Sequence, residues 1–151
     1  MQQTINAIIQ DHPAYKFVND NVFVWSAQKK QVHYDESLIN QQEGVWSLLH
    51  EIGHANLGHT GYRDDLELLM MEVAAWKEAK GIAKKYEITI EDSHIDGCID
   101  TYRDWLHSRS RCVECKTHSM QLDNTTYQCH NCQTQWKVPA SRMCDIRRRR
   151  V

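Results

Sequence analysis

The sequence contains no hydrophobic run that approaches the roughly 18 apolar residues required by a membrane-spanning helix. Its first residues, MQQTINAIIQDHPAYK, lack the basic start and apolar stretch of a secretory signal. No internal repeat is visible either. These absences argue against a membrane protein and predict a cytoplasmic location. Thiols stay reduced in the cytoplasm, and paired cysteines there bind metal more often than they form disulfides.

Net charge is also small, at −2 for 151 residues, and the hydrophobic (41%) and charged (25%) contents are those of an ordinary globular chain. We therefore expect one folded, soluble domain with room for a small appendage. The charge is unevenly spread, because residues 1–100 hold 16 acidic and 8 basic side chains whereas residues 101–151 hold 4 and 10. This change predicts an acidic body, residues 1–108, followed by a basic C-terminal segment.

The pattern of apolar residues predicts an α+β fold. Segments rich in valine, tyrosine and tryptophan predict a small antiparallel sheet, with strands at residues 15–19, 22–26 and 31–35. Helical periodicity predicts helices at residues 5–10, 37–57 (one helix, or two divided at Gly44), 64–85 and 90–109, the last capped by Asp92 or Ser93.

Three polar residues stand in an otherwise apolar helical run, LLHEIGHANLGH at residues 48–59. His50 and His54 are four residues apart, so a helix places both imidazoles on one face, at a spacing that supplies two zinc ligands. Glu51 projects about 100° away from His50. There it can take a proton from a water molecule at the metal and return it to a leaving amine. We interpret the set as a catalytic zinc site; a solvated helix face is the alternative.

A catalytic zinc site needs a third protein ligand. His59 follows the helix-ending Gly58 and lies about 140° off the ligand face, so we expect it at the rim of the site. Glu72 is the better candidate, because it is a single carboxylate on an apolar helical stripe, and a buried ionised carboxylate needs a positive partner. That stripe consists of Leu68, Leu69, Ala75, Trp76, Ala79 and Ile82. A salt bridge from Glu72 to a lysine or arginine is the alternative.

The segments HEIGHANLGH and MEVAAWKEA together resemble the ImmA/IrrE group of gluzincin metallopeptidases, over about residues 5–107. The resemblance implies a zincin-like core with the zinc ligands His50, His54 and Glu72, the general base Glu51, and Ala75 as the small residue of an E-x-x-A pattern. It also implies a strand before the active helix, VFVWS or QVHYD, to whose edge an extended substrate adds. Members of the group cut repressors or other regulators of mobile elements and stress responses. Several of them carry a DNA-binding helix-turn-helix, which is not visible in this sequence.

A second constellation consists of two C-x-x-C pairs thirteen residues apart, formed by Cys112, Cys115, Cys129 and Cys132. Strands at 118–122 and 125–129 are expected to join the pairs as a hairpin. Four thiolates make a closed tetrahedral zinc site, which supplies much of the folding free energy of so small a module. We expect a structural zinc ribbon over residues 109–140, with two disulfides as the alternative, and a disordered basic tail over residues 141–151.

Other residues of this segment have simpler interpretations. Cys98 is expected in the core, Cys144 as a free thiol, His130 in solvent and Trp136 packed beside the metal. The basic residues can contact phosphates, which predicts a weak nucleic-acid contact, with ordinary solubility as the alternative. They are Arg109, Arg111, Lys116, Lys137, Arg142 and the four arginines at 147–150.

The sequence therefore predicts a zinc-dependent endopeptidase, with one catalytic and one structural Zn²⁺, that acts on a protein substrate such as a DNA-binding regulator. Two alternatives stay open. A SprT-like protease for DNA-bound proteins would need a histidine as its third ligand, and a non-catalytic binding protein would use both metal sites as scaffold. Candidates for stabilising the oxyanion are Tyr62, His94 and Tyr102.

Overall fold

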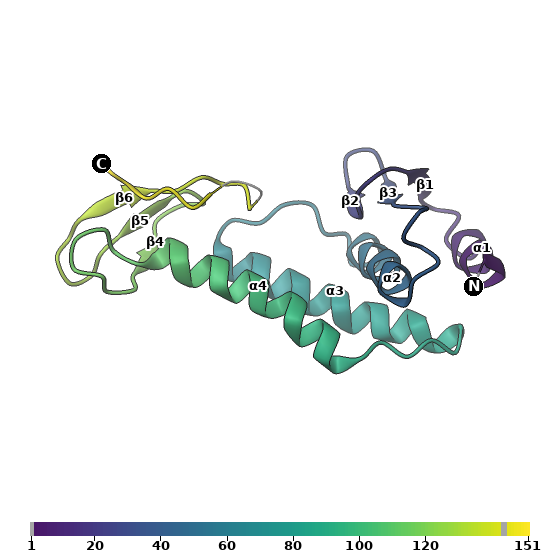
Figure 1. Ribbon diagram of the computed structural model, residues 1–151. Coiled ribbons are helices and arrows are strands. Elements are labelled where there is room, and N and C mark those ends of the chain that lie inside the picture. The colour runs from purple at the N-terminus through teal and green to yellow at the C-terminus, as the bar shows by residue number, and fades with distance from the viewer. Residues whose placement is uncertain (1, 143–144) are drawn as a thin grey trace. The chain divides into compact units, whose positions relative to one another are not determined.

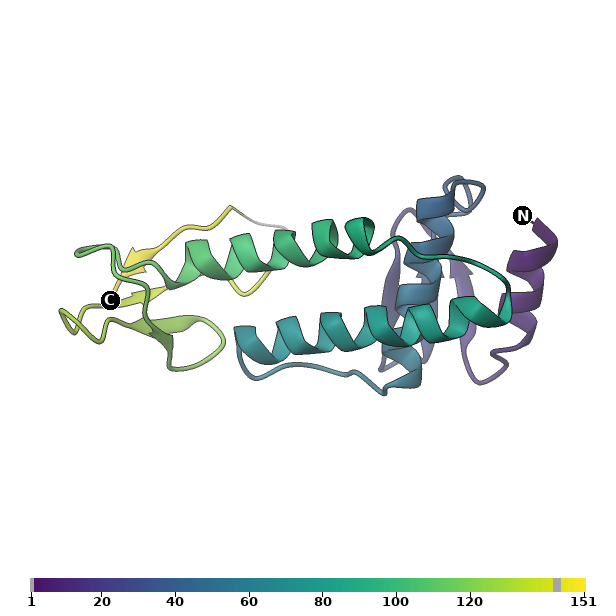
Figure 2. The same ribbon diagram turned by 90° about the horizontal axis from the view of Figure 1, so that it is seen from below.

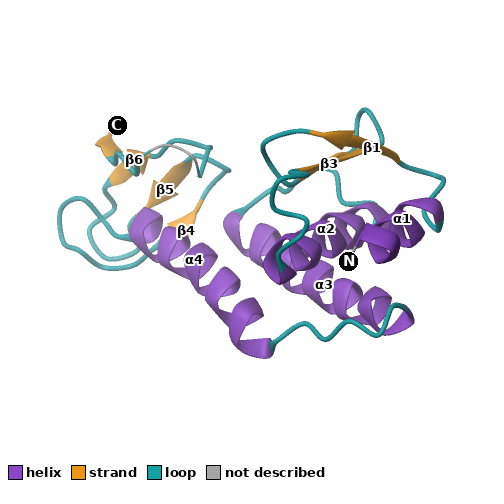
Figure 3. Cartoon of the chain, turned by 45° about the vertical axis from the view of Figure 1, so that its right-hand side comes forward, coloured by secondary structure: helices purple, strands orange, loops and turns teal. Residues whose placement is uncertain are grey.

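The computed structural model describes residues 2–142 and 145–151. Within these residues the chain forms four α-helices and two small sheets, which confirms the α+β class (Figure 3). None of the helices in the described part of the chain combines the length and apolar character of a membrane span. Cys144, which we expect to be a free thiol, lies outside the described residues.

The chain gathers into two compact units. The first comprises Met1–Gly61 and Met70–Ile95, and the second comprises Tyr62–Leu69 and Asp96–Val151. The boundary predicted near residue 108 follows the change in charge. The compact units instead divide where packing changes, and a segment from the middle of the chain joins the C-terminal residues.

The first unit contains two complete helices, a three-stranded sheet and most of a third helix (Figure 1). In chain order these are α1 (Gln2–Gln10), β1 (Lys16–Asn19), β2 (Val24–Ser26), β3 (Gln31–Tyr34), α2 (Gln42–Asn56) and α3 (Asp65–Lys85). The sheet covers one side of α2, and α3 crosses the other side at a steep angle (Figure 2). The apolar side chains of α2 are therefore buried, and Leu48, Leu49 and Ile52 are completely covered.

The sheet of the first unit is mixed, so the prediction of an antiparallel sheet is wrong for one pair of strands. Its order is β1-β3-β2, in which β2 pairs antiparallel with β3 but β1 runs parallel to β3. The segment between β1 and β2 carries the chain past the position that β3 later fills. A tight turn then leads into β3, with Lys30 at a φ of 50°. Composition indicates which segments are strands. It does not indicate how they pair, because the same residue types occur in parallel and antiparallel pairs.

The second helix, α2, begins later than its sequence pattern predicts. α2 starts at Gln42 and not at residue 37. Asp35 accepts hydrogen bonds from the backbone N–H and the hydroxyl of Ser37, at 2.8 and 2.6 Å, and such local bonds favour a turn over a helix. The helix ends, as predicted, before Gly58, whose φ of 66° is a left-handed conformation that glycine adopts without strain.

A glycine also sets the distance between α2 and α3. Gly53 of α2 faces the backbone of Ala75 on α3, and a Cβ atom at Gly53 would lie 2.5 Å from the Ala75 carbonyl oxygen. Real Cβ atoms essentially never come that close, so the helices can approach because residue 53 has no side chain. This contact brings the face of α2 that carries His50 and His54 against the face of α3 that carries Glu72.

The second unit contains most of α4 and a four-stranded sheet. α4 (Asp92–Ser110) leads into β4 (Met120–Gln121), β5 (Thr126–Gln128), β6 (Gln135–Lys137) and β7 (Arg149–Arg150), which pair in that order and antiparallel. β4 and β5 form the predicted hairpin. The Asp123 carboxylate holds its turn by accepting from the N–H groups of Thr125 and Thr126. The core of this sheet is small and consists of Cys112, Tyr127, Cys129, Trp136 and Val138.

The basic tail contains a strand where we expected disorder. β7 pairs antiparallel with β6, because the edge of β6 offers backbone N–H and C=O groups to a neighbouring segment. Arg150 also forms an ion pair of 2.8 Å with Glu114. Consecutive arginines indicate charge, but they leave the backbone able to pair.

Arg109 lies in the core of the second unit, so its predicted role as a phosphate contact is wrong. Its side chain is 1% exposed and donates from Nε to Asp65 at 3.0 Å. It also donates to the carbonyl oxygens of Asn124 and Pro139. This buried ion pair joins Asp65, in the segment of residues 62–69, to the C-terminal part of the same unit. Removing one partner of such a pair typically costs about 3–5 kcal/mol.

Candidate metal centres

The three side chains predicted to bind the first metal come together in the first unit. His50 and His54 lie one turn apart on α2, and their Nε2 atoms are 3.0 Å apart. Glu72 approaches from α3, with its Oε2 3.1 Å from His50 Nε2 and its Oε1 3.5 Å from His54 Nε2. One ligand atom from each residue lies within 4.8 Å of the others, so this group can hold a metal ion.

The chemistry of this group fits a divalent cation. Glu72 is 6% exposed and His50 is 7% exposed. Among the described residues, the ion pairs of Glu72 are made with His50 and His54, and the alternative of a lysine or arginine partner is not found there. A buried carboxylate needs a positive partner, and two imidazole nitrogens with one carboxylate oxygen are a ligand set of catalytic zinc sites.

The same contacts change the pKa values of the group. Burial raises the pKa of Glu72, but hydrogen bonds from His50 and His54 outweigh burial and lower the pKa to about 2. Burial lowers the pKa of His54, yet the hydrogen bond and charge of Glu72 raise it above its usual value. Glu72 is therefore ionised at neutral pH, which is the form that binds a metal.

Glu51 lies beside these ligands and outside the metal-binding group. Its Oε2 accepts a hydrogen bond of 2.7 Å from the backbone N–H of Trp25 on β2. Burial raises the pKa of Glu51 above its usual range, against the opposing charges of His50 and His54. A carboxylate with a raised pKa suits a general base that later acts as an acid.

His59 contacts the candidate ligand His54 but is not part of the group that can hold a metal ion. Its Nδ1 lies 2.8 Å from Nδ1 of His54, whereas His54 faces His50 and Glu72 through Nε2. Burial and the neighbouring His54 lower the pKa of His59, which favours a neutral ring that accepts the Nδ1–H of His54. The His59 carbonyl accepts a hydrogen bond of 2.9 Å from the indole of Trp25. His59 is thus an outer partner that orients His54.

Replacing His59 with alanine is expected to weaken metal binding at the first site by about 10–100-fold, the usual effect of removing an outer partner. A chelator competition titration that leaves the four-cysteine site loaded measures this affinity. His12→Ala is the control, because His12 lies at the end of α1 and contacts the Ile8 carbonyl. Complete loss of the first metal in His59→Ala would contradict the outer role and make His59 a ligand.

Two tryptophans at the site escaped the sequence-based prediction. Trp25 contacts Glu51 through its backbone and His59 through its indole, and the Trp76 ring lies 4.2 Å from the His50 ring. For Trp76, the sequence contains one indication of its place at the site, because helical spacing predicts it on the same apolar stripe as Glu72. No pattern marks Trp25, because its contact with Glu51 spans 26 residues and uses the main chain.

One of the three candidates for oxyanion stabilisation, His94, lies in the same compact unit as the metal-binding group. Its ring packs edge-on against Trp46 and Trp76, at centroid distances of 4.8 and 5.5 Å. Tyr62 and Tyr102 belong to the second unit. Of the three candidates for stabilising the oxyanion, His94 is therefore the one in the first unit, together with His50, His54 and Glu72.

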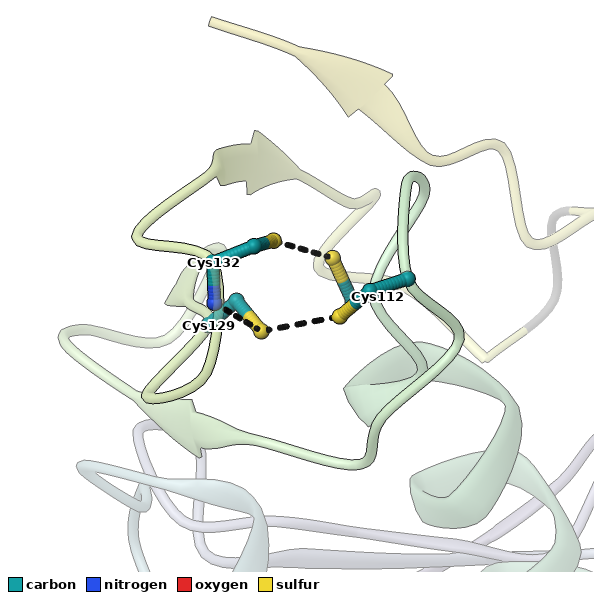
Figure 4. Close-up of side chains that lie close together, drawn as sticks. Cys112, Cys129 and Cys132 are labelled. Carbon is teal, nitrogen blue, oxygen red and sulfur yellow. Dashed lines mark hydrogen bonds between the residues drawn. The ribbon is translucent and has the colours of Figure 1, made fainter.

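The four predicted cysteines form a second group that can hold a metal ion, in the second unit. Cys112 and Cys132 have their Sγ atoms 3.6 Å apart, and Cys115 and Cys129 have theirs 3.4 Å apart. Figure 4 shows the labelled side chains of Cys112, Cys129 and Cys132 pointing toward one another. These separations approach the edge of a tetrahedron with zinc–sulfur distances of about 2.3 Å, roughly 3.8 Å. All four are free thiols, so the alternative of two disulfides is not present.

Backbone N–H groups donate hydrogen bonds to two of these sulfur atoms. The N–H of Glu114 donates to Cys112 Sγ and the N–H of Cys132 donates to Cys129 Sγ, both at 3.4 Å. Hydrogen bonding with Thr117 lowers the pKa of Cys115 to about 5, whereas burial raises the pKa of Cys112. Donors aimed at sulfur favour the thiolate, which is the form that binds zinc.

The remaining residues of the ribbon lie close to where the sequence predicts. Trp136 is completely buried in the same small core as Cys112 and Cys129, and its indole donates to the Arg109 carbonyl at 2.9 Å. His130 is exposed, as predicted. Cys98, expected in the core, is half-buried on α4.

No family model, no curated protein and no solved structure matches this chain. The resemblance to the ImmA/IrrE group therefore rests on the two motif segments. The function must be inferred from the chain's own side chains.

Proposed function

We propose that this protein is a zinc-dependent endopeptidase that cleaves a protein substrate. The observation that carries the proposal is the convergence of His50, His54 and Glu72, with Glu51 beside them and outside the ligand set. Three protein ligands and an adjacent carboxylate are what hydrolytic zinc sites use, whereas structural zinc sites have four protein ligands. The four-cysteine group is the structural counterpart, so we propose two zinc ions per chain.

Each residue of the site has a defined task in this proposal. His50, His54 and Glu72 would hold the metal, which when bound acts as a Lewis acid toward the scissile carbonyl and lowers the pKa of its water. Glu51 accepts the proton of the attacking water at a carboxylate oxygen and delivers it to the leaving amine. Its raised pKa supports both steps, since a group that gives back a proton must not be too acidic.

The edge strand β2 supports an extended peptide as the substrate. β2 is at the edge of the sheet, and the Trp25 N–H points away from β3 toward Glu51. A peptide that adds to β2 as a further strand would therefore run past the proposed base. β3, the other strand considered as an edge, is central and cannot take this role. The resemblance to the ImmA/IrrE group suggests a cytoplasmic transcriptional regulator as the substrate class.

Cleavage assays with Glu51→Gln test the proposal. The amide keeps the shape of Glu51 but cannot accept the proton, so cleavage of a candidate regulator should fall by about 10²–10⁴-fold while both metals stay bound. Glu43→Gln is the matched control, because Glu43 is an exposed carboxylate on the same helix. The inactive variant also serves as a trap for capturing the substrate.

Equal cleavage by Glu51→Gln and the wild type would reject this mechanism. Absence of cleavage by the fully metal-loaded wild type, toward every protein recovered with the trap, would favour the non-catalytic binding protein. A SprT-like protease would instead have a histidine as its third ligand. His59 does not favour this alternative, because it contacts Nδ1 of His54 and not the Nε2 side that faces His50 and Glu72.

A further inference from the structure

The second unit carries a polar pocket that the proposed peptidase site does not use. The pocket has a volume of about 310 Å³. It is lined by His107, Ser108, Arg111, Lys116, His118 and Arg148. These residues come from the end of α4, from the segment after it that contains Cys112 and Cys115, and from the tail before β7. Segments distant in the sequence therefore converge here.

The charge of this pocket is entirely positive. Arg111, Lys116 and Arg148 are cationic at neutral pH, and no aspartate or glutamate is among the described residues that line the pocket. Arg148 donates to the Arg111 carbonyl at 2.8 Å, and Lys116 donates to the Val113 carbonyl at 2.6 Å. These contacts position two cations without neutralising them. The nearby Glu114 is already paired with Arg150.

Two histidines add donors to the same pocket. The rings of His107 and His118 stack with centroids 3.8 Å apart, and Nδ1 of His118 lies 3.0 Å from the Ser110 hydroxyl. Burial, the neighbouring His107 and the charge of Arg111 lower the pKa of His118. An electropositive site of this kind favours an anion with several oxygen acceptors.

We propose that this pocket binds a backbone phosphate of a nucleic-acid strand. Arg111, Lys116 and Arg148 supply the charge, and the guanidinium groups match phosphate oxygens in geometry. A polyanion is favoured over a free phosphate because Arg147 and Arg149 are exposed beside the pocket in the chain. Their charges act within a Debye length of about 10 Å, where further phosphates of the strand would lie. This proposal is independent of peptidase activity.

Fluorescence anisotropy with a labelled 20-nucleotide DNA, single-stranded or duplex, tests the proposal on the full zinc-loaded chain. Arg111→Gln with Arg148→Gln should weaken binding by roughly tenfold at low salt, because one phosphate contact is lost. The slope of log K against log salt should become shallower by the value for one phosphate, about 0.9 for the duplex or about 0.7 for the single strand. A second variant, Arg111→Gln with Lys116→Gln, keeps the hydrogen bond from Arg148 to the backbone carbonyl of residue 111 and should weaken binding similarly.

The controls separate a defined site from net charge and from unfolding. Lys29→Gln with Lys84→Gln removes the same charge from exposed positions of the first unit and should bind like the wild type. Zinc content reports that each variant keeps its ribbon, as does the part of the tryptophan emission that a Trp136→Phe reference chain lacks. Equal binding by the pocket variants and this control overturns the proposal. So does a wild type that binds inorganic phosphate but no nucleic acid.

Discussion

Replacing Cys129 with serine is expected to remove one zinc ion per chain and to unfold the ribbon. Cys129 is completely buried, and among the described residues the core to which it belongs is small, with four other buried residues and the partly buried Val113 packed against them. So small a core cannot offset the conformational entropy of the loops, whereas zinc binding to such sites contributes roughly 10–16 kcal/mol of apparent free energy at pH 7. Serine offers a harder, protonated oxygen and leaves three thiolates without closure of the site.

Metal analysis measures this effect, together with the part of the tryptophan emission that is lost in a Trp136→Phe reference chain, because Trp136 is one of five tryptophans and is fully buried in the ribbon core. Its emission should shift toward that of exposed tryptophan, and the same shift should follow prolonged chelation of the wild type. Cys98→Ser is the matched control, since Cys98 is a half-buried thiol outside the metal-binding group. A Cys129→Ser chain that keeps two metals and a buried Trp136 would show that the ribbon folds without its fourth thiolate.

Replacing Glu72 with alanine is expected to empty the first metal site and to abolish cleavage completely. The carboxylate supplies the third ligand and the negative charge between two buried imidazoles. Without it, His50 and His54 offer two neutral nitrogens, and the loss of affinity should exceed the roughly 100-fold upper effect of an outer partner. The effect on activity should exceed that of Glu51→Gln, because that variant keeps the metal.

Metal content should therefore fall from two ions to one in Glu72→Ala. Glu78→Ala is the matched control on the same helix, because Glu78 contacts Asn56 and lies outside the metal-binding group; it should keep both ions. The opposite pattern, with Glu72→Ala retaining two metals and His59→Ala losing one, would make His59 the third ligand. That result would promote the SprT-like alternative.

The helical part of the site could be predicted from the sequence, because helices convert spacing into geometry. Four-residue spacing places His50 and His54 on one face, and Glu72 stands out as a carboxylate on an apolar stripe. The two C-x-x-C pairs are equally informative, because their spacing leaves few ways to arrange four sulfur atoms. In each case the side chains lie together in a group that can hold a metal ion.

The rest could not be predicted because it depends on contacts between distant segments. Strand order in the first sheet depends on the path of the loops that connect the strands, and the residue types of the strands do not determine that path. Arg109 carries the charge of a surface residue, yet Asp65, 44 residues earlier, neutralises it in the core. Trp25 acts at the site partly through a backbone N–H, and every residue except proline has one.

The contact between Gly53 and Ala75 makes the proposed chemistry depend on a backbone spacing. Gly53 lies three residues after His50, and Ala75 lies three residues after Glu72, so this close contact is about one helical turn from a candidate ligand on each helix. A methyl group there would act as a wedge and draw the carboxylate away from the imidazoles. Metal affinity can thus be altered by a residue that does not contact the ion. The distance between the two helix backbones at this contact sets how closely Glu72 can approach His50 and His54.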